Sequence, residues 1–208
     1  MFESTTKQPL PTRTQILEAA EAAVLAKGFS ATSIDELIAT VGISKSGFFY
    51  HFKDKAALAR ALLERYIAAE NELFDEIARR SRELNEDPLH GFLVELKMLA
   101  EVLEDIPNGH PGCIIASYCY QDRLFDNDVR QLTAAALLNW RERFKQRLEA
   151  IAQVYPQRVD VDLDDLADMV SAVADGGIIL SKVLRSPDIL PRQIMLYRAF
   201  VRTIFLGN

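Results

Sequence analysis

Residues 33–55 read SIDELIATVGISKSGFFYHFKDK, and this stretch decides the fold. Ser33 and Glu36 have the spacing of a capping box, which predicts the start of a helix that Gly42 ends after two turns. Ser44 can cap a second short helix directly afterwards. Because a glycine leaves room for a sharp reversal of the chain, the two short helices are expected to form a helix-turn-helix.

Apolar residues of this stretch have the spacing to pack between its two helices and a preceding helix. They are Leu37, Val41, Ile43 and Phe48. The second short helix then presents its N-terminal end, which carries Lys45, Ser46, Gly47 and Phe49. Such an end fits the major groove of DNA, where the first turn of a recognition helix meets base edges. The side chains that follow, Tyr50, His51, Lys53 and Lys55, are donors of the kind that contact phosphates.

Helical periodicity continues outward from this stretch in both directions, and no segment shows the sustained alternation of a strand. We therefore predict an all-α fold, with residues 1–55 as a three-helix DNA-binding domain and residues 56–208 as a larger helical ligand-binding and dimerisation domain. Caps, prolines and glycines mark the ends of the expected helices of the whole chain. These helices cover 12–27, Ser33 to Gly42, Ser44 to about residue 51, Asp54 to about 84, 89–105, 113–124, 127–154, 163–185 and 189–206.

Composition excludes several classes of protein. The chain has 208 residues, of which 49% are apolar and 26% charged, so it can bury a sizeable core and is not a disordered chain. Two cysteines do not make a disulfide scaffold. No run approaches the roughly 18 to 20 apolar residues of a membrane span, and the N-terminal MFESTTKQPLPTR lacks the apolar segment of a secretion signal. We expect a cytoplasmic protein that does not associate with membranes.

The net charge of −6 is unevenly distributed. Residues 1–55 contain six basic and six acidic residues, so residues 56–208 account for the whole excess of negative charge. A neutral N-terminal region on an acidic remainder weakly favours contact between that region and a polyanion.

Residues 42–45 (GISK) and 48–55 (FFYHFKDK) resemble the DNA-binding signature of the TetR family of bacterial transcriptional repressors. The resemblance implies a homodimer on a palindromic double-stranded DNA operator, released when a small organic inducer binds the C-terminal domain. By position it implies base contacts from Lys45, Ser46, Gly47 and Phe49, and phosphate contacts from Ser33, Ser44, Tyr50, His51 and Lys55. The family usually has Tyr at the position of Phe49, so Tyr50 is expected to supply the hydroxyl.

The C-terminal region offers candidate ligand contacts on its central helices. They combine apolar bulk with a few polar groups, as a pocket for an organic ligand does. The candidates are Met98, Cys113, Ser117, Tyr120, Trp140, Phe144 and Asp175. Each apolar one is individually more typical of plain core. Asp175 precedes Gly176 and Gly177 inside an apolar helix, where two glycines weaken the helix by roughly 2 kcal/mol and require a compensating contact.

The last two predicted helices are apolar over a wide arc, which indicates burial on several sides. Together they predict half of a four-helix bundle across a two-fold axis, with an ordinary monomer core as the alternative.

Other functions have less support. His110 and Cys113 resemble a Cys–His pair, but a turn separates them and no third residue orients them, so we predict no catalytic site. Neither a metal site nor a cofactor site is indicated: the acidic residues 159–165 lack the glycine and distal glutamate of a calcium loop and suit a helix N-terminus. Cys113 is interpreted as a small buried residue, with a reactive thiol as the alternative. A helical ligand-binding or partner-binding module without a DNA role remains the second alternative.

Overall fold

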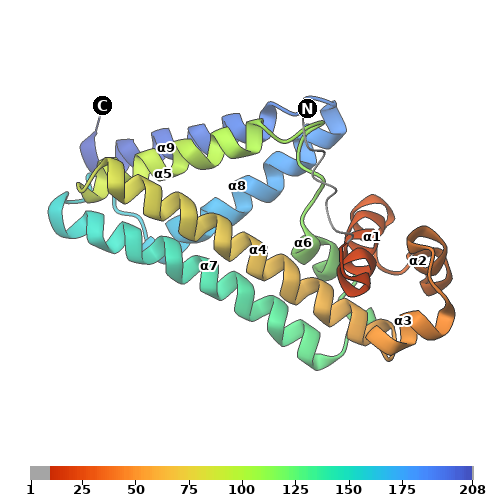
Figure 1. The fold of residues 1–208 in the computed structure, drawn as a ribbon. Coiled ribbons are helices and arrows are strands. Elements are labelled where there is room, and N and C mark those ends of the chain that lie inside the picture. The colour runs from red at the N-terminus through yellow and green to blue at the C-terminus, as the bar shows by residue number, and fades with distance from the viewer. Residues whose placement is uncertain (1–9, 208) are drawn as a thin grey trace, which may run out of the picture.

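The computed structural model describes residues 10–207, and within them every regular element is helical (Figure 1). The elements are α1 (Thr12–Lys27), α2 (Ile34–Val41), α3 (Lys45–His51), α4 (Lys55–Leu84), α5 (Pro88–Glu104), α6 (Ile114–Cys119), the 3-10 helix η1 (Asp122–Leu124), α7 (Asn127–Val154), α8 (Leu163–Leu184) and α9 (Ile189–Leu206). We call α1–α3 the head and α4–α9 the body. The predicted all-α class is confirmed.

Local capping produces the two short helices of the head. The Ser33 hydroxyl accepts a hydrogen bond from the backbone N–H of Glu36 at 3.1 Å, and the Ser44 hydroxyl accepts one from Gly47 at 3.1 Å. Between the helices, Gly42 adopts a left-handed conformation with φ of +74°, which favours glycine. The predicted helix-turn-helix is therefore present.

The body is a bundle around the long helix α4. In Figure 1, α4 runs from the head across the body, with α7 along one side and α5 along the other, while α9 packs on α5 and α8 crosses behind. The Asp54 carboxylate caps the start of α4 by accepting a hydrogen bond from the N–H of Ala57 at 2.7 Å. No described helix is both long and apolar enough to cross a membrane.

The head and the body share one hydrophobic cluster. Leu17 and Phe48 of the head are buried in the same cluster as Leu62 of α4, Tyr118 of α6 and Trp140 of α7. The core therefore continues across residue 55. The domain boundary predicted at this residue stays a prediction.

One predicted helix differs from the structure. The expected helix 113–124 ends at Cys119, and the chain continues through a turn into η1. Long-range contacts explain the break: the Gln121 carboxamide oxygen accepts a hydrogen bond from the N–H of Ser30 at 2.9 Å. Phe125 also stacks on Tyr118, with ring centroids 4.2 Å apart. Both contacts involve residues that follow the end of α6.

The structure explains one glycine of the α8 pair and the acidic residues at the start of this helix. A Cβ on Gly177 would lie 2.8 Å from the Leu190 side chain and 3.1 Å from its Cα, so this glycine permits close packing of α8 on α9. Nothing lies within 4 Å of a Cβ on Gly176, and the structure does not explain that glycine. Asp162 caps α8 by accepting hydrogen bonds from the next two acidic residues, Asp164 and Asp165, as the helix-N-terminus interpretation predicts.

Candidate functional site

Helix α3 exposes the face that the sequence assigns to DNA. Phe48 is fully buried and fixes the helix on the head, while Lys45 and Ser46 are exposed. Phe49 is 41% exposed and Tyr50 is 85% exposed, which is unusual for aromatic side chains. The structure therefore leaves the side chains of Lys45, Ser46, Phe49 and Tyr50 on α3 free to contact another molecule.

Two serines of this surface are already used in capping. Ser33 and Ser44 accept backbone hydrogen bonds, and Ser44 also shares a hydrogen bond with Ser46 at 3.0 Å. Both remain exposed, so a hydroxyl proton is available to an acceptor in solution. His51 is half-buried with its ring against Tyr50, and Gly47 is half-buried next to the Ser44 hydroxyl.

Lys55 makes contacts within the chain, and its predicted phosphate contact stays a prediction. Its ammonium group donates hydrogen bonds to the carbonyl oxygens of Phe29 at 2.8 Å and Ser30 at 3.4 Å. It also lies 4.6 Å from the centre of the Phe29 ring, and partial burial lowers its pKa. These contacts direct Lys55 to the junction between α1 and α2, so we do not include it among the proposed phosphate contacts.

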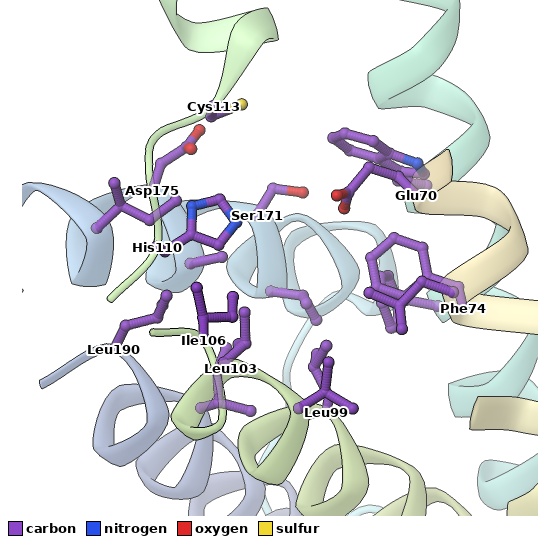
Figure 2. A pocket seen from close by; sticks show the side chains of 18 of the residues that line it. Glu70, Phe74, Leu99, Leu103, Ile106, His110, Cys113, Ser171, Asp175 and Leu190 are labelled. Atoms are coloured by element: carbon purple, nitrogen blue, oxygen red, sulfur yellow. The ribbon is translucent and has the colours of Figure 1, made fainter. Parts of the chain in front are cut away.

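The body contains an apolar cavity of about 180 Å³ between α4, α5, α7, α8 and the segment that precedes α6 (Figure 2). Its wall consists mainly of aliphatic and aromatic side chains, with few polar groups. The lining residues are Tyr66, Glu70, Leu73, Phe74, Leu99, Val102, Leu103, Ile106, His110, Cys113, Trp140, Phe144, Val170, Ser171, Ala174, Asp175, Ile178, Leu190 and Ile194.

The structure brings four of the seven predicted ligand contacts together around this cavity: Cys113, Trp140, Phe144 and Asp175. The other three lie elsewhere. Met98 packs against a hydrophobic cluster of α4, α5, α8 and α9 without lining the cavity. The Ser117 hydroxyl donates to the Cys113 carbonyl within its own helix, and Tyr120 is 82% exposed where α6 ends early.

Two carboxylic acids face the cavity from opposite walls, Glu70 on α4 and Asp175 on α8 (Figure 2). Burial raises the pKa of Glu70 to about 7, and the negative charges of Glu21 and Asp175 contribute in the same direction. Burial also raises the pKa of Asp175, while a hydrogen bond with the Cys113 thiol opposes this shift. Both acids therefore lie in surroundings that disfavour their ionised forms.

The Cys–His alternative is not supported by the electrostatics of the cavity. Burial and the nearby Asp175 carboxylate raise the pKa of Cys113 to about 12, so its thiol stays protonated at neutral pH. Burial and the positive charge of Lys182 lower the pKa of His110. No cluster of three potential metal ligands occurs among residues 10–207.

Sequence reasoning missed the side of the cavity that α4 forms. Tyr66, Glu70 and Phe74 are spaced four residues apart and therefore lie on one face of the helix. That face otherwise packs into the protein, so an acidic residue in an apolar stripe was the signal that pointed to Glu70.

A short route of contacts connects the cavity to the head. Ile106, His110 and Cys113 line the cavity, and α6 begins directly after Cys113. The Tyr118 hydroxyl on α6 donates to the Ala59 carbonyl of α4 at 3.0 Å, and its ring packs edge-on against Phe29 of the head.

Helices α8 and α9 carry apolar side chains that residues 10–207 do not cover. Most of the apolar residues of α9 that suggested a dimer contact are buried inside the chain, including Ile194, Tyr197 and Val201. The exposed ones form stripes on the two helices: Ile179, Leu180, Val183 and Leu184 on α8, and Met195, Leu196 and Phe200 on α9.

Comparisons with known proteins agree with the arrangement of the head. A sequence profile described as "Bacterial regulatory proteins, tetR family" matches residues 16–62. The chain is 26% identical over 191 residues to the "Probable HTH-type transcriptional regulator ArpR" of Pseudomonas putida, covering 90% of this chain and 87% of that protein. It is 22% identical over 176 residues to the "HTH-type transcriptional repressor DhaR" of Mycobacterium sp. strain GP1, covering 85% of each chain.

Solved structures show the same fold over nearly the whole chain. A TetR-family regulator from Agrobacterium tumefaciens superposes with a TM-score of 0.75 at 18% identity, covering 93% of this chain and 97% of that one. The reduced form of NemR from E. coli superposes with a TM-score of 0.71 at 19% identity, covering 94% and 97% of the two chains.

Proposed function

Because the chain belongs to the TetR family of helix-turn-helix transcriptional regulators, which is not a family of enzymes, we propose that it is a ligand-responsive repressor. In this proposal a homodimer binds a palindromic operator and is released when a small organic molecule enters the cavity of the body. The name of the similar protein DhaR supports repression over activation.

The exposed N-terminal half of α3 is the observation that carries the proposal. A recognition helix needs one face held rigidly and the other free to enter the major groove. Phe48 holds one face of α3 against the head, and Lys45, Ser46 and Phe49 lie on the free face. Lys45 lies 3.5 Å from Asp35, but both side chains are well exposed, so this ion pair is weak and exchanges readily for a contact to DNA.

The base and phosphate roles are separable by mutation. We assign Lys45 to base edges and Tyr50 to a phosphate. Fluorescence anisotropy on operator DNA, identified by selection from random oligonucleotides, tests both Lys45→Ala and Tyr50→Ala. Both variants should bind the selected operator more weakly, but only Lys45→Ala should lose preference over random DNA. Equal losses on both DNAs for both variants would contradict these roles.

The uncovered apolar stripes of α8 and α9 support dimerisation. Stripes on two adjacent helices can meet their symmetry copies to form a four-helix bundle, which buries both sets of side chains. Such a dimer would place two α3 helices about 34 Å apart, or at a multiple of that distance, to match successive turns of the duplex.

Sedimentation analysis tests the dimer. Val183 is 74% exposed and Leu196 is 63% exposed, so replacing either by Asp should leave the fold intact while placing charge in the proposed interface. Both variants should sediment as monomers and bind only a half-operator. Leu84→Asp is the matched control, since Leu84 is 70% exposed at the end of α4. If both variants remained dimers, the dimer interface would not be formed by these stripes of α8 and α9.

Release follows from the contacts between cavity and head. A ligand that displaces the segment 106–113 moves α6, which contacts α1 and α4. The same ligand lies against α4, which carries the head at its N-terminal end. Operator affinity falls if the ligand binds the displaced arrangement more tightly, and coupling free energies of about 1–3 kcal/mol are usual.

A further inference from the structure

The cavity has an aromatic wall. The Phe74 ring packs edge-on against Trp140, with centroids 6.1 Å apart, and against Phe144, with centroids 5.5 Å apart. Together with Tyr66 they give the wall four aromatic side chains from α4 and α7. Aromatic rings attract cations as well as apolar groups, and cages of such rings hold quaternary ammonium ligands.

The charges inside this cavity are of one sign. Glu70 and Asp175 both line it, and no lysine or arginine is among the lining residues. His110 also lines it, but burial and the charge of Lys182 lower its pKa and so favour the neutral imidazole. Within residues 10–207 neither acid takes part in an ion pair, and no positive group lowers the pKa of Glu70. The polar contact of Asp175 is the Cys113 thiol, which is a weak donor.

The nearest cations of the surrounding helices are directed to other partners. Arg65 lies 3.4 Å from Glu18, and Arg143 lies 2.6 Å from Asp75 with its guanidinium 5.9 Å from the centre of the Phe74 ring. The Nη1 of Arg65 and the Nε of Arg143 are buried without a hydrogen-bond partner among the described residues. Lys182 donates to the carbonyl oxygen of Pro111. Glu70 and Asp175 are half-buried. A carboxylate that is removed from water is costly unless it is paired, so two of them in one apolar cavity favour a positive charge that the described residues do not provide.

An independent observation shows that polar partners are missing at this site. Trp140 is 7% exposed, and its buried indole Nε1 has no hydrogen-bond partner. Buried donors are nearly always satisfied in folded proteins, and each exception requires an explanation. Because Trp140 lines the cavity, this N–H fits a ligand that carries an acceptor atom, and it does not itself bear on the charge of that ligand.

We propose that the cavity binds an apolar organic cation, an ammonium compound whose charge lies between Glu70 and Asp175 and whose apolar part packs on Phe74, Trp140 and Phe144. The inference rests on the proposed ligand-responsive function and adds the chemical class of the ligand.

Three probes of one shape and different charge test the proposal: benzyltrimethylammonium, its neutral carbon isostere neopentylbenzene, and the anion phenylmethanesulfonate. Trp140 is the only tryptophan in the chain, so quenching of its emission reports binding at the cavity directly. Calorimetry provides a second readout. The cation should bind at least about tenfold more tightly than the neutral isostere, which corresponds to about 1.4 kcal/mol, and the anion should bind most weakly.

The variant Glu70→Gln tests whether the charge of Glu70 provides the affinity for the cation. It should reduce the affinity for the cation about tenfold while leaving the affinity for neopentylbenzene unchanged, and the second measurement also verifies that the cavity is intact. Glu72→Gln is the matched control, because Glu72 is exposed on the same helix. Equal or tighter binding of the neutral or anionic probe to the unmodified protein would overturn the proposal, as would unchanged selectivity in Glu70→Gln.

The same probes separate this inference from the proposed function. If the neutral or anionic probe both binds and releases operator DNA while the cation does not, the ligand-responsive function stands and the assigned charge is wrong. If the cation binds with the expected selectivity but leaves operator affinity unchanged, the ligand class stands and the release mechanism is wrong.

Discussion

The junction between head and body differs from the cavity in how completely its polar groups are paired. At the junction, Tyr118 donates to a carbonyl of α4, Gln121 accepts from Ser30, and Lys55 donates to Phe29. In the cavity, Glu70 and the indole nitrogen of Trp140 lack such partners within the described chain. The two regions are adjacent, since Trp140 belongs to the junction cluster and also lines the cavity.

This difference indicates separate roles. The junction is held by several long-range hydrogen bonds, although the buried Nη1 of Arg65 has no hydrogen-bond partner among the described residues. A tightly packed junction has one well-defined arrangement, so displacement of α6 or α4 is passed to the head rather than absorbed. Unpaired groups in the cavity make the free protein less stable than its packing allows, and a ligand that pairs them recovers that stability. Mutations in the two regions should therefore have opposite effects.

The largest effect is expected from Tyr118→Ala at the junction. Tyr118 is 1% exposed, packs edge-on against Phe29 and stacks on Phe125, so its removal leaves a cavity and deletes the hydrogen bond to the Ala59 carbonyl. The free energy of unfolding, measured with urea, should fall by about 3–5 kcal/mol. Tyr120→Ala, two residues on and 82% exposed, should change it by less than about 0.5 kcal/mol. Similar values for the two variants would show that the junction is not tightly packed.

Glu70→Gln should have the opposite sign and depend on pH. In the folded protein the pKa of Glu70 is about 7, above its ordinary value of 4.5. As pH rises from 4.5 to 7, the unfolded chain loses this proton while the folded chain retains it, so stability falls over that window and the loss is complete above pH 7. The variant should therefore be more stable than the parent at pH 8, by at most about 3 kcal/mol, and equally stable at pH 4.

Urea unfolding at the two pH values measures this difference, with Glu72→Gln as the control because its carboxylate is exposed. A stability gain that is the same at pH 4 and pH 8 would mean that the charge of Glu70 is not responsible.

Gly177→Ala and Gly176→Ala form a matched pair on the α8 wall. A Cβ on Gly177 meets Leu190, so this change should destabilise the fold by about 1–3 kcal/mol through overpacking. A Cβ on Gly176 meets nothing within 4 Å, so alanine there should stabilise the helix by up to about 1 kcal/mol. Thermal unfolding at equal protein concentration distinguishes them. Equal shifts would mean that α8 and α9 are not in close contact at Gly177.

The smallest effect is expected from Gln121→Ala. It removes the acceptor for the exposed Ser30 N–H, which water can replace, so stability should fall by about 1 kcal/mol or less. Its effect on regulation should be larger, because the contact joins the end of α6 to the head. Operator release by a cavity ligand should require a higher ligand concentration in this variant than in Gln146→Ala, an exposed control on α7. Identical release curves would show that Gln121 does not transmit ligand binding from the cavity to the head.

Most of the fold was predictable because local chemistry sets it. The bounds of α1, α7 and α9 agree with the sequence, since Pro, Gly and Asp residues mark where these helices begin and end. The head was predictable for the same reason: Gly42 and the serine caps act within a few residues of themselves.

The rest depends on contacts between distant segments. The break after Cys119 follows from the hydrogen bond of Gln121 with Ser30, 91 residues earlier, which no local pattern reveals. The contact of Lys55 with the Phe29 carbonyl, 26 residues earlier, is likewise a matter of the fold and not of local sequence. In α9, periodicity indicates an apolar helix but not which side chains face the chain itself: Ile194 is buried, whereas Leu196 is exposed.

Helix α4 has a mechanical consequence. It runs through 30 residues without a proline or glycine, so it behaves as a stiff lever about 45 Å long. Glu70 lies 15 residues after Lys55, which places the cavity about 22 Å along the shaft from the head. A tilt of about 5° with its pivot at Glu70 would carry the head end through about 2 Å, given that spacing. A slight shift of the side chains at the pivot would therefore move α3 by a large part of the distance that separates a formed base contact from a broken one.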